Sequence, residues 1–459
     1  MNLNDSILNG KRHIHFIGIG GSGMYPLAQI LHAQGYYLTG SDNNPTDTLE
    51  KVKAMGIPVF MGQRAENIEG ADLIVHTAAI MADNPELIAA KASGVPVLER
   101  SKMLGILSTH FSNAVCVSGT HGKTTTSSML TQIMLDAGAD PTAVIGGKLP
   151  AIGGSGRIGQ SEHMVCEACE FVDTFLQLSP DIALVLNIDE DHMDYFKTME
   201  NLIASFHKFC SMATRYIVFN GDDENTHKAV DSIDKPKITF GFAETNDYYP
   251  ANIQKQQGVH TTFDLMHHGE KLTSIDVFVP GIHNVLNATA ACACALASGV
   301  PADKLNIGMK NFKGACRRFE VLYHENGITV VDDYAHHPAE IRVTLTAAQS
   351  MDYKRVIAVH QPFTYSRTAR LLDDFAEVLQ IADLVVLSEI MGSREKNTIG
   401  IYTKDLACKI PGCVWYPEFP EIADYVASIA QPGDLIITLG CGDVNKCAHM
   451  IIDRLQAKK

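Results

Sequence analysis

The sequence predicts an α/β protein of three consecutive domains with mainly parallel sheets. The chain has 459 residues, which is too many for a single hydrophobic core. Short unbroken apolar runs alternate with helical apolar patterns, as is typical of parallel strands that are buried on both faces. Two of these runs lead directly into glycine-rich turns that open helices. We place the domains at residues 1–108, 109–312 and 313–459.

Composition and charge argue against several classes of binding partner and location. The net charge of −15 argues against a nucleic-acid partner, because contacts to phosphates need clustered Lys and Arg. No run of about 18 apolar residues occurs, so we expect no membrane insertion, and residues 1–5 lack the features of a secretory signal. Most of the cysteines lie inside apolar runs, which indicates buried thiols in a reducing cytoplasm. Cys166-x-x-Cys169 has no convincing second pair, so we favour buried thiols over zinc there.

The first domain opens with a phosphate-binding pattern. An apolar run at 13–17 precedes Gly-Ile-Gly-Gly-Ser-Gly at 18–23, and a helical pattern follows to about Gln34. This spacing lets a pyrophosphate approach a helix N-terminus, while Asp42 at the end of the next apolar run would accept a sugar hydroxyl. The pattern predicts a Rossmann-like domain. It does not distinguish a nicotinamide dinucleotide from a UDP-sugar, because both carry a diphosphate.

The second domain is organised around residues 118–126, Ser-Gly-Thr-His-Gly-Lys-Thr-Thr-Thr. An apolar run leads in and a helical pattern leads out, so backbone N–H groups and a helix N-terminus would face a triphosphate. Lys123 would neutralise the β- and γ-phosphates, and the hydroxyl of Thr124 would hold Mg²⁺. The strict motif has a glycine where this chain has Val117, and the alternative is an ordinary small-residue turn. We predict a central P-loop ATPase domain.

Two further side chains of the second domain are candidate metal ligands. Glu167 closes one apolar run, and His192 follows the next. The carboxyl ends of parallel strands meet at one edge of a sheet, where ligands bind. Glu167 would share a Mg²⁺ ion with Thr124, whereas His192 could bind a second ion. The alternative for Glu167 is a solvated carboxylate, and we expect the acidic run 189–191 to be a solvated loop.

The third domain repeats the alternation of apolar runs and helical patterns, which predicts a second Rossmann-like sheet. At its start, Arg317-Arg318 could clamp a triphosphate or form an interdomain salt bridge. The segment 332–338, Asp-Asp-Tyr-Ala-His-His-Pro, closes one apolar run. One of its histidines could steer a phosphate or the attacking group while one aspartate holds a ribose.

Taken together, these motifs resemble the Mur ligases. The stretch Gly119–Thr126 matches the Gly-Thr-x-Gly-Lys-Thr-Thr/Ser form of that family, which also accounts for Val117. The resemblance extends from about His13 to Lys446. The other motifs that carry it are Gly18–Met24 with Ser41-Asp42, Glu167, Asn187–His192, Gly281-x-His283-Asn284-x-x-Asn287, Arg317–Glu320, Asp332–Pro338, Gln361-Pro362-x-x-Tyr365-Ser366-Arg367-Thr368 and Thr438-Leu439-Gly440-x-Gly442-Asp443.

The resemblance implies a role for each matching residue. The residues that would bind ATP are Gly119, Thr120, His121, Gly122, Lys123, Thr124, Thr125, His283, Asn284, Asn287, Arg318 and Asp333. The residues that would hold the UDP-sugar are Gly18, Gly20, Gly21, Ser22, Gly23, Met24, Asp42, Thr77 and Arg100. The residues that would face the amino acid or the acceptor are His336, His337 and Arg367. The metal ligands would be Thr124, Glu167 and His192, and the catalytic side chains Lys123, Arg318 and His336.

The resemblance also implies a reaction. The lactyl carboxylate of UDP-N-acetylmuramate would attack the γ-phosphate of ATP, with Mg²⁺ as the metal, and the amine of L-alanine would attack the resulting acyl phosphate. Phe363-Thr364 stands where many relatives have His-Arg, so alanine, glycine and serine all stay open as the amino acid. We expect a cytoplasmic monomer or homodimer.

Three other functions compete with this interpretation. A nicotinamide-dependent dehydrogenase would explain the 18–23 turn but not Lys123, Glu167 or the arginine pair. A non-catalytic nucleotide switch would bind ATP without turnover. A ligase that adds a preformed tripeptide to the same UDP-sugar, for cell-wall recycling, would differ from the first reaction only in its amine substrate.

Overall fold

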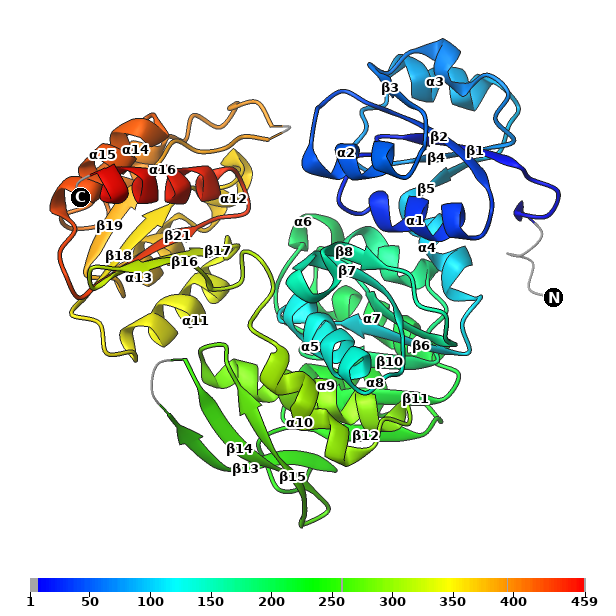
Figure 1. Cartoon of the computed structure of the whole chain (residues 1–459). Helices are drawn as coiled ribbons and strands as arrows, with labels where there is room; N and C mark the ends of the chain where they lie inside the picture. The colour runs from blue at the N-terminus through cyan, green and yellow to red at the C-terminus, as the bar shows by residue number, and fades with distance from the viewer. Residues whose placement is uncertain (1–6, 257–258, 394, 458–459) are drawn as a thin grey trace. The chain divides into compact units, whose positions relative to one another are not determined.

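The computed structural model describes residues 7–256, 259–393 and 395–457 (Figure 1). In this described part the strands form three sheets, of five, ten and six strands. Each sheet is mainly parallel and uses a different stretch of the chain, which confirms the predicted α/β class with three domains. The chain divides into two compact units, the first comprising residues 1–253, 263–276 and 286–312, and the second residues 254–262, 277–285 and 313–459.

The five-stranded sheet belongs to the first unit and follows the predicted Rossmann-like order. From edge to edge its strands are β3 (Val59–Met61), β2 (Tyr37–Asp42), β1 (His13–Ile17), β4 (Leu73–His76) and β5 (Val97–Glu99). Its helices are α1 (Tyr25–Ala33), α2 (Asp47–Ala54), the 3₁₀ helix η2 (Ala65–Ile68), α3 (Pro85–Ala92) and α4 (Arg100–Ser108). The central strand β1 pairs in parallel with β2 and β4, so the glycine turn that follows it lies at the middle of the sheet edge.

The ten-stranded sheet also belongs mainly to the first unit. Its order is β15 (Glu270–Val277), β14 (Thr261–His267), β13 (Tyr248–Lys255), β12 (Lys237–Phe240), β11 (Tyr216–Asn220), β10 (Ile182–Val185), β6 (Asn113–Ser118), β9 (His163–Glu167), β7 (Thr142–Leu149) and β8 (Gly154–Arg157). Its helices are α5 (Lys123–Asp136), η3 (Pro150–Ile152), η4 (Phe171–Gln177), α6 (Met193–Phe196), α7 (Met199–Met212), α8 (Glu224–Val230), α9 (Ile282–Ala297) and α10 (Ala302–Asn311). Because β6 lies between β10 and β9, in parallel with both, the loops after these three strands meet at one edge.

Between about 247 and 279 the sequence has short β-type runs without helices, which predict a small antiparallel insertion. The three strands of this segment, β13, β14 and β15, extend the ten-stranded sheet instead of forming a separate one. The connection is the parallel pair of β12 and β13 at Phe240 and Tyr248. Short β-type runs without helices predicted the strands, but the sequence pattern did not show which strand of the sheet they pair with.

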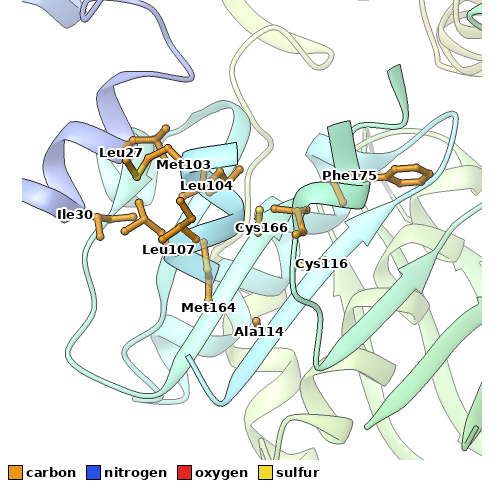
Figure 2. Close-up of a cluster of buried hydrophobic side chains, with 14 of the residues drawn as sticks. Leu27, Ile30, Met103, Leu104, Leu107, Ala114, Cys116, Met164, Cys166 and Phe175 are labelled. Carbon is orange, nitrogen blue, oxygen red and sulfur yellow. The ribbon is translucent and has the colours of Figure 1, made fainter. Parts of the chain in front are cut away.

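One hydrophobic cluster joins the two sheets of the first unit (Figure 2). It includes Leu27 of α1, Leu104 of α4 and Phe175 of η4, all of them buried. Gly105 of α4 packs so closely on η4 that a Cβ there would collide with the carbonyl oxygen of Gln177. The first two domains therefore share a core.

A second contact between these domains is polar. The Ser155 hydroxyl of β8 donates to the carbonyl oxygen of Ser22 at 3.0 Å, and the Lys51 ammonium donates to that of Gly153 at 2.6 Å. A Cβ on Gly156 would lie only 2.6 Å from the Cβ of Pro26. The glycine turn of the first domain is therefore attached to the β7–β8 hairpin of the second.

The six-stranded sheet belongs to the second unit. Its order is β16 (Glu320–Glu325), β17 (Ile328–Asp333), β21 (Asp434–Leu439), β18 (Arg355–His360), β19 (Leu384–Leu387) and β20 (Val414–Trp415), with β16 antiparallel to β17. The helices are α11 (Pro338–Gln349), α12 (Tyr365–Arg370), α13 (Leu372–Leu379), α14 (Thr403–Ala407), α15 (Phe419–Ile429) and α16 (Val444–Ala457). Separate hydrophobic clusters cover the two faces, one with α11 and α13 and the other with α15 and α16.

Across residues 7–256, 259–393 and 395–457, no helix has the length and apolar character needed to span a membrane.

Candidate functional site

The glycine turn between β6 and α5 has the local geometry that the motif predicts. Gly119 and Gly122 have φ angles of +135° and +85°, in the region that favours glycine. A Cβ on Gly122 would lie 2.7 Å from Oδ1 of Asn287, and one on Gly119 would lie 2.9 Å from the Cβ of Leu186. Helix α5 begins at Lys123, so its first N–H groups, which have no acceptor inside the helix, point into this turn.

Val117, which replaces the glycine of the strict motif, is a strand residue. It is fully buried in β6 and lies beside Leu184 of β10 and Glu167 of β9. The turn therefore begins later than the strict motif requires, and a side chain at this position fills the core.

The loop that follows β10 holds the turn in place. Oδ1 of Asn187 accepts the N–H of His121 at 2.8 Å, and its amide donates to the His121 carbonyl at 3.1 Å. The Thr120 N–H donates to the Asn187 carbonyl at 3.1 Å, and the Thr120 hydroxyl accepts the N–H of Asp189 at 2.9 Å. The side chain of Asp189 is exposed, as expected of a solvated loop, but the backbone of this loop is fixed to the turn. In the sequence, the only indication of the role of this loop was a polar residue, Asn187, after an apolar run.

The Lys123 side chain is mostly buried, with 14% of it exposed, and its ammonium has several acceptors. It donates to the carbonyl oxygens of Gly119 and Thr120 and to both carboxylate oxygens of Glu170, at 3.1 and 2.9 Å. Burial alone would lower the pKa of Lys123, but the negative charge of Glu170, with smaller contributions from Cys169 and Glu167, raises the pKa above its ordinary value. Lys123 is therefore charged at neutral pH, as a phosphate-binding lysine must be.

Thr124 and Glu167 meet at the edge of the sheet, where the sequence placed the metal site. The Thr124 hydroxyl donates to Oε2 of Glu167 at 2.8 Å, and the same oxygen accepts the N–H of Gly146 at 2.9 Å. A hydroxyl and a carboxylate are hard oxygen ligands that suit Mg²⁺, which usually completes its shell with water and phosphate oxygens. Among the described residues no group of three or more His, Cys, Asp or Glu side chains is arranged to hold a metal without such partners.

His192 lies near Glu170, the acid that accepts hydrogen bonds from Lys123. Its Nε2 atom is 4.0 Å from Oε1 of Glu170 and 3.6 Å from Oδ2 of Asp191. Its φ angle of +55° is unusual for a residue other than glycine, and its ring packs on Phe171 with centroids 4.6 Å apart. The structure thus connects His192 to Lys123 through Glu170, a residue for which no motif predicted a role.

The predicted adenine neighbours lie at the start of α9. Asn287 contacts the turn at Gly122, as described above. The amide of Asn284 donates to the carbonyl of Pro280 at 2.6 Å. Burial lowers the pKa of His283 to about 4, so its ring is neutral at pH 7.

The first domain gathers the predicted UDP-sugar residues around its glycine turn. The N–H groups of Gly18 and Ile19 donate to the Ser41 carbonyl at 2.8 and 3.0 Å, and the Gly20 N–H donates to Oδ2 of Asp42 at 2.9 Å. The side chain of Thr77 packs against Gly18.

The other end of this turn is covered by Arg100 and enters α1. The Arg100 side chain lies 3.0 Å from the position of a Cβ on Gly23. A Cβ on Gly21 would lie 3.5 Å from the side chain of Met24, which is itself buried. The carbonyl of Ser22 accepts the bond from β8. The predicted set is therefore close in space, and the Asp42 carboxylate is partly engaged by the turn itself.

The sequence did not predict a buried polar network beneath this turn. Oε1 of Glu86 lies 2.8 Å from Nε2 of His15, and Oε2 accepts the Ser41 hydroxyl at 2.6 Å. Nδ1 of His15 lies 2.8 Å from the Thr39 hydroxyl. The Ser41 carbonyl holds the turn, so Glu86 fixes the strand end on which the turn rests.

In the second unit, the two arginines of the predicted pair have different surroundings. Nε of Arg317 donates to Oδ2 of Asp332 at 2.8 Å, and its Nη2 donates to the Gly440 carbonyl at 2.6 Å. This ion pair joins two residues of one unit, so the structure pairs Arg317 with an acid of its own domain. The guanidinium of Arg318 lies 5.0 Å from the centre of the Tyr334 ring.

Asp333 is buried at the end of β17. Its carboxylate accepts the N–H groups of Phe319 at 2.7 Å and Ala335 at 2.8 Å. Burial raises the pKa of Asp333 to about 6, although the charge of Arg318 and the two N–H groups oppose this rise. A carboxylate in this environment favours a hydrogen-bond donor as its partner.

The two predicted histidines also differ. Nδ1 of His336 lies 3.2 Å from Oε2 of Glu340 and 3.1 Å from the Tyr334 carbonyl. His337 is the N-cap of α11, and its Nδ1 accepts the N–H of Ala339 at 3.4 Å. The structure thus gives His337 a capping role in addition to the substrate contact that the resemblance implied.

Three buried polar atoms of the second unit have no hydrogen-bond partner within the described residues: Nη1 of Arg367, Oε1 of Gln361 and Nε2 of His360. Nδ1 of His360 bonds to the Leu439 carbonyl at 3.0 Å, and burial lowers the pKa of His360 to about 4. A Cβ on Gly442 would collide with Oε1 of Gln361. Buried polar atoms are normally paired with protein or with ordered water, and none of these three is paired with another described residue. Of these residues, the resemblance had implied a ligand only for Arg367.

Comparisons with known proteins match nearly the whole length of the chain. Three domain models match in order: "Mur ligase family, catalytic domain" over residues 13–112, "Mur ligase middle domain" over 117–295, and "Mur ligase, glutamate ligase domain" over 317–442. Two curated relatives, from Acetivibrio thermocellus and Agathobacter rectalis, are UDP-N-acetylmuramate–L-alanine ligases, and each is 43% identical to this chain. These matches cover 97% and 94% of this chain and 96% of each relative.

Solved structures give the same result. The UDP-N-acetylmuramate–alanine ligase of Thermotoga maritima matches with a TM-score of 0.83 at 27% identity, covering 97% of this chain and 100% of its own. A murein peptide ligase from Psychrobacter arcticus matches with a TM-score of 0.73 at 23% identity, covering 97% of this chain and 98% of its own, which shows the shared fold alone.

Proposed function

Because the chain belongs to the Mur ligase family, we propose that it is an ATP-dependent ligase that joins L-alanine to the lactyl carboxylate of UDP-N-acetylmuramate. The observation that carries this proposal is the 43% identity to L-alanine ligases along 97% of the chain. The reaction would release ADP and phosphate, and it would be the first peptide step in making a peptidoglycan precursor. The eleven cysteines, all free, support a reducing cytoplasm as its location.

The turn after β6 is the proposed phosphate site. The charged Lys123 and the first N–H groups of α5 would bind the β- and γ-phosphates of ATP. Thr124 and Glu167 would hold Mg²⁺, with His192 as the ligand of a second ion. When bound, Mg²⁺ supplies positive charge that offsets the negative charge of the reacting phosphates. Asn287 supports the turn from α9, next to the His283 and Asn284 that we propose for the adenine.

The turn after β1 is the proposed UDP-sugar site. The N–H groups at the start of α1 and the guanidinium of Arg100 would bind the diphosphate. Family membership explains this turn without a nicotinamide cofactor, since the matching model covers residues 13–112. The dehydrogenase alternative therefore has no separate support.

The chemistry proceeds in two steps. A carboxylate is a poor electrophile, so the lactyl carboxylate first attacks the γ-phosphorus and ADP leaves, which produces an acyl phosphate. The neutral amine of L-alanine then attacks the acyl carbon, phosphate leaves, and the nitrogen loses one proton and keeps the single hydrogen of the amide. We propose that Arg367 binds the carboxylate of L-alanine and that His336, oriented by Glu340, lies beside the reacting groups. Lys123 and Arg318 would stabilise the negative charge that develops.

A substrate panel tests the proposal. Phosphate release is measured with ATP, Mg²⁺ and UDP-N-acetylmuramate, adding L-alanine, glycine, L-serine or a preformed tripeptide in separate reactions. We expect turnover with L-alanine and none without an amine, and we expect Lys123→Ala to lose ADP release while it still binds the UDP-sugar. Turnover with the tripeptide alone would replace the proposal by the recycling ligase, and ATP binding without any turnover would leave the nucleotide-switch alternative.

A further inference from the structure

Glu170 is a buried acid at the phosphate site to which no function has been given. It follows β9 and precedes η4, and only 1% of its side chain is exposed. Both of its carboxylate oxygens accept hydrogen bonds from the Lys123 ammonium. A charge this deeply buried is stable only when it is paired, so the contact is a built feature of the site.

The same carboxylate also lies close to His192, the proposed metal ligand. Oε1 of Glu170, which bonds to Lys123 at 3.1 Å, lies 4.0 Å from Nε2 of His192. Phe171, the next residue, packs its ring on His192. A short segment of chain thus contacts both the phosphate-binding cation and the imidazole.

The remaining contacts of Lys123 show what Glu170 does to it. The carbonyls of Gly119 and Thr120 accept bonds from the same ammonium, so the lysine is directed along the turn by three residues at once. A lysine side chain has four rotatable bonds and little orientation of its own. Without the carboxylate the two carbonyls would still keep the ammonium near the turn, but its position would be less well defined.

We propose that Glu170 is a positioning residue for phosphoryl transfer, which fixes the Lys123 ammonium and the His192 imidazole toward the same triphosphate. This inference rests on the proposed function, because it assumes that the turn after β6 transfers a phosphoryl group. Glu170 would touch neither ATP nor the acid substrate. It would act by keeping one cation and one ligand in the geometry that the transition state needs.

The first test separates positioning from binding. In Glu170→Gln, Lys123 keeps its positive charge, while the negative charge of Glu170, which repels phosphate, is removed. We therefore expect ATP to bind as tightly as in the wild type or more tightly. We expect kcat to fall about 10- to 100-fold and the Mg²⁺ concentration for half-maximal activity to rise about tenfold, as is typical when a supporting residue of such a site is lost. KM for UDP-N-acetylmuramate should stay the same. Glu162→Gln, an exposed acid just before β9, is the matched control and should change none of these values.

The second test needs neither substrate nor turnover. Lys123→Met leaves the buried Glu170 without its cation and should lower the unfolding temperature clearly. Adding Glu170→Gln to that variant should restore part of the loss, because an unpaired buried charge is then removed. Calorimetry of the wild type, both single variants and the double variant completes the cycle.

The outcomes are distinct. Parallel loss of ATP affinity, kcat and unfolding temperature in Glu170→Gln would reduce Glu170 to a purely structural role, and an unchanged kcat would overturn the proposal. Strictly additive unfolding temperatures would show that the Lys123–Glu170 pair is not coupled. If the wild type shows no ATP turnover with UDP-N-acetylmuramate and any amine, the proposed function fails, whereas the unfolding cycle and the ATP affinities still test the contact itself.

Discussion

At the scale of single residues, steric crowding limits which side chain a position accepts, and burial changes pKa values. Gly122 is the clearest example, because both its left-handed backbone and the neighbouring Asn287 exclude a side chain. Lys123, Asp333 and His360 show the second effect, since their buried environments move their pKa values in directions set by nearby charge and by the loss of water. Each effect makes a prediction at the scale of one residue.

Gly122→Ala should destabilise the protein more than Gly138→Ala does. Both glycines have a positive φ, +85° and +78°, but a Cβ on Gly138 meets no atom within 4 Å. Backbone strain alone should lower the free energy of unfolding by about 1 kcal/mol at Gly138, and the collision with Asn287 should bring the loss at Gly122 to about 3 kcal/mol. Urea unfolding measures both. Adding Asn287→Ala should return Gly122→Ala toward the control, and failure to do so would rule out this collision as the cause.

His360 should make stability depend on pH. Its pKa is about 4 in the folded protein, below the 6.5 of a free histidine, so the unfolded chain binds more protons between these values. Its contribution is therefore complete above pH 6.5 and is lost as pH falls toward 4, with a total of about 3 kcal/mol. His360→Phe, which keeps an aromatic ring, should flatten the rise of the unfolding free energy between pH 4 and 6.5.

Asp333 should change the stability with pH in the opposite direction to His360, so it serves as a control. Its folded pKa of about 6 lies above the ordinary 3.8, so the folded protein binds more protons between these values. This residue therefore makes stability fall as pH rises from about 4 to about 6. Asp333→Asn should steepen the rise that His360→Phe flattens, and a profile that moves the same way in both variants would contradict the assignment.

At the scale of elements, the strand–turn–helix units were predictable and the contacts between loops were not. The apolar runs and the two glycine turns led to β1–α1 and β6–α5, because a period and a glycine pattern are local properties of the sequence. The Thr124–Glu167 contact was also predicted, since adjacent parallel strands end at one edge. The edge strand β16 was not predicted, because it is recognised by its pairing with the next strand, β17, and not by a pattern in its own residues.

The sequence also did not reveal the residues whose roles depend on side-chain contacts. Glu170, Asn187, Glu86 and His360 all face residues that are distant in the chain. A spacing rule records which residue types occur, whereas these roles follow from which atoms meet after folding. The sequence therefore predicted the turn better than the residues that support it.

Asn187 gives the prediction that belongs to this scale. Asn187→Ala leaves the N–H and carbonyl of His121 without their partners, an effect of about 1–3 kcal/mol, so we expect KM for ATP to rise about tenfold. KM for UDP-N-acetylmuramate should not change. Asn225→Ala removes a bond to Ile188 in the same loop but none to the turn, and it should leave both KM values near those of the wild type. Equal effects of the two variants would mean that the whole loop, and not Asn187, supports the turn.

At the scale of the whole molecule, the first two domains share a hydrophobic cluster while the third has its own. The two compact units follow this division. The single tryptophan, Trp415, lies on β20 in the second unit, so its fluorescence reports on that unit alone. Circular dichroism reports on the helices of both.

Gly105→Ala tests the shared core. Alanine is normally favoured over glycine within a helix by about 1 kcal/mol, but here its Cβ would collide with the carbonyl of Gln177 in η4. We therefore expect destabilisation of about 1–3 kcal/mol in place of a gain. The loss should appear in the dichroism transition of the first unit and leave the Trp415 transition in place. A stabilised variant, or a Trp415 transition that moves equally, would contradict the division.

The bond from Ser155 to the carbonyl of Ser22 has a consequence for recombination between related enzymes. Exchanging residues 1–108 for the first domain of another family member would transfer the glycine turn after β1 but leave behind the hairpin on which it rests. Lys51 and Pro26 would also lose their partners Gly153 and Gly156. A segment that keeps these polar contacts is therefore discontinuous: it contains the first domain together with residues 142–157, although these lie beyond its border in the sequence.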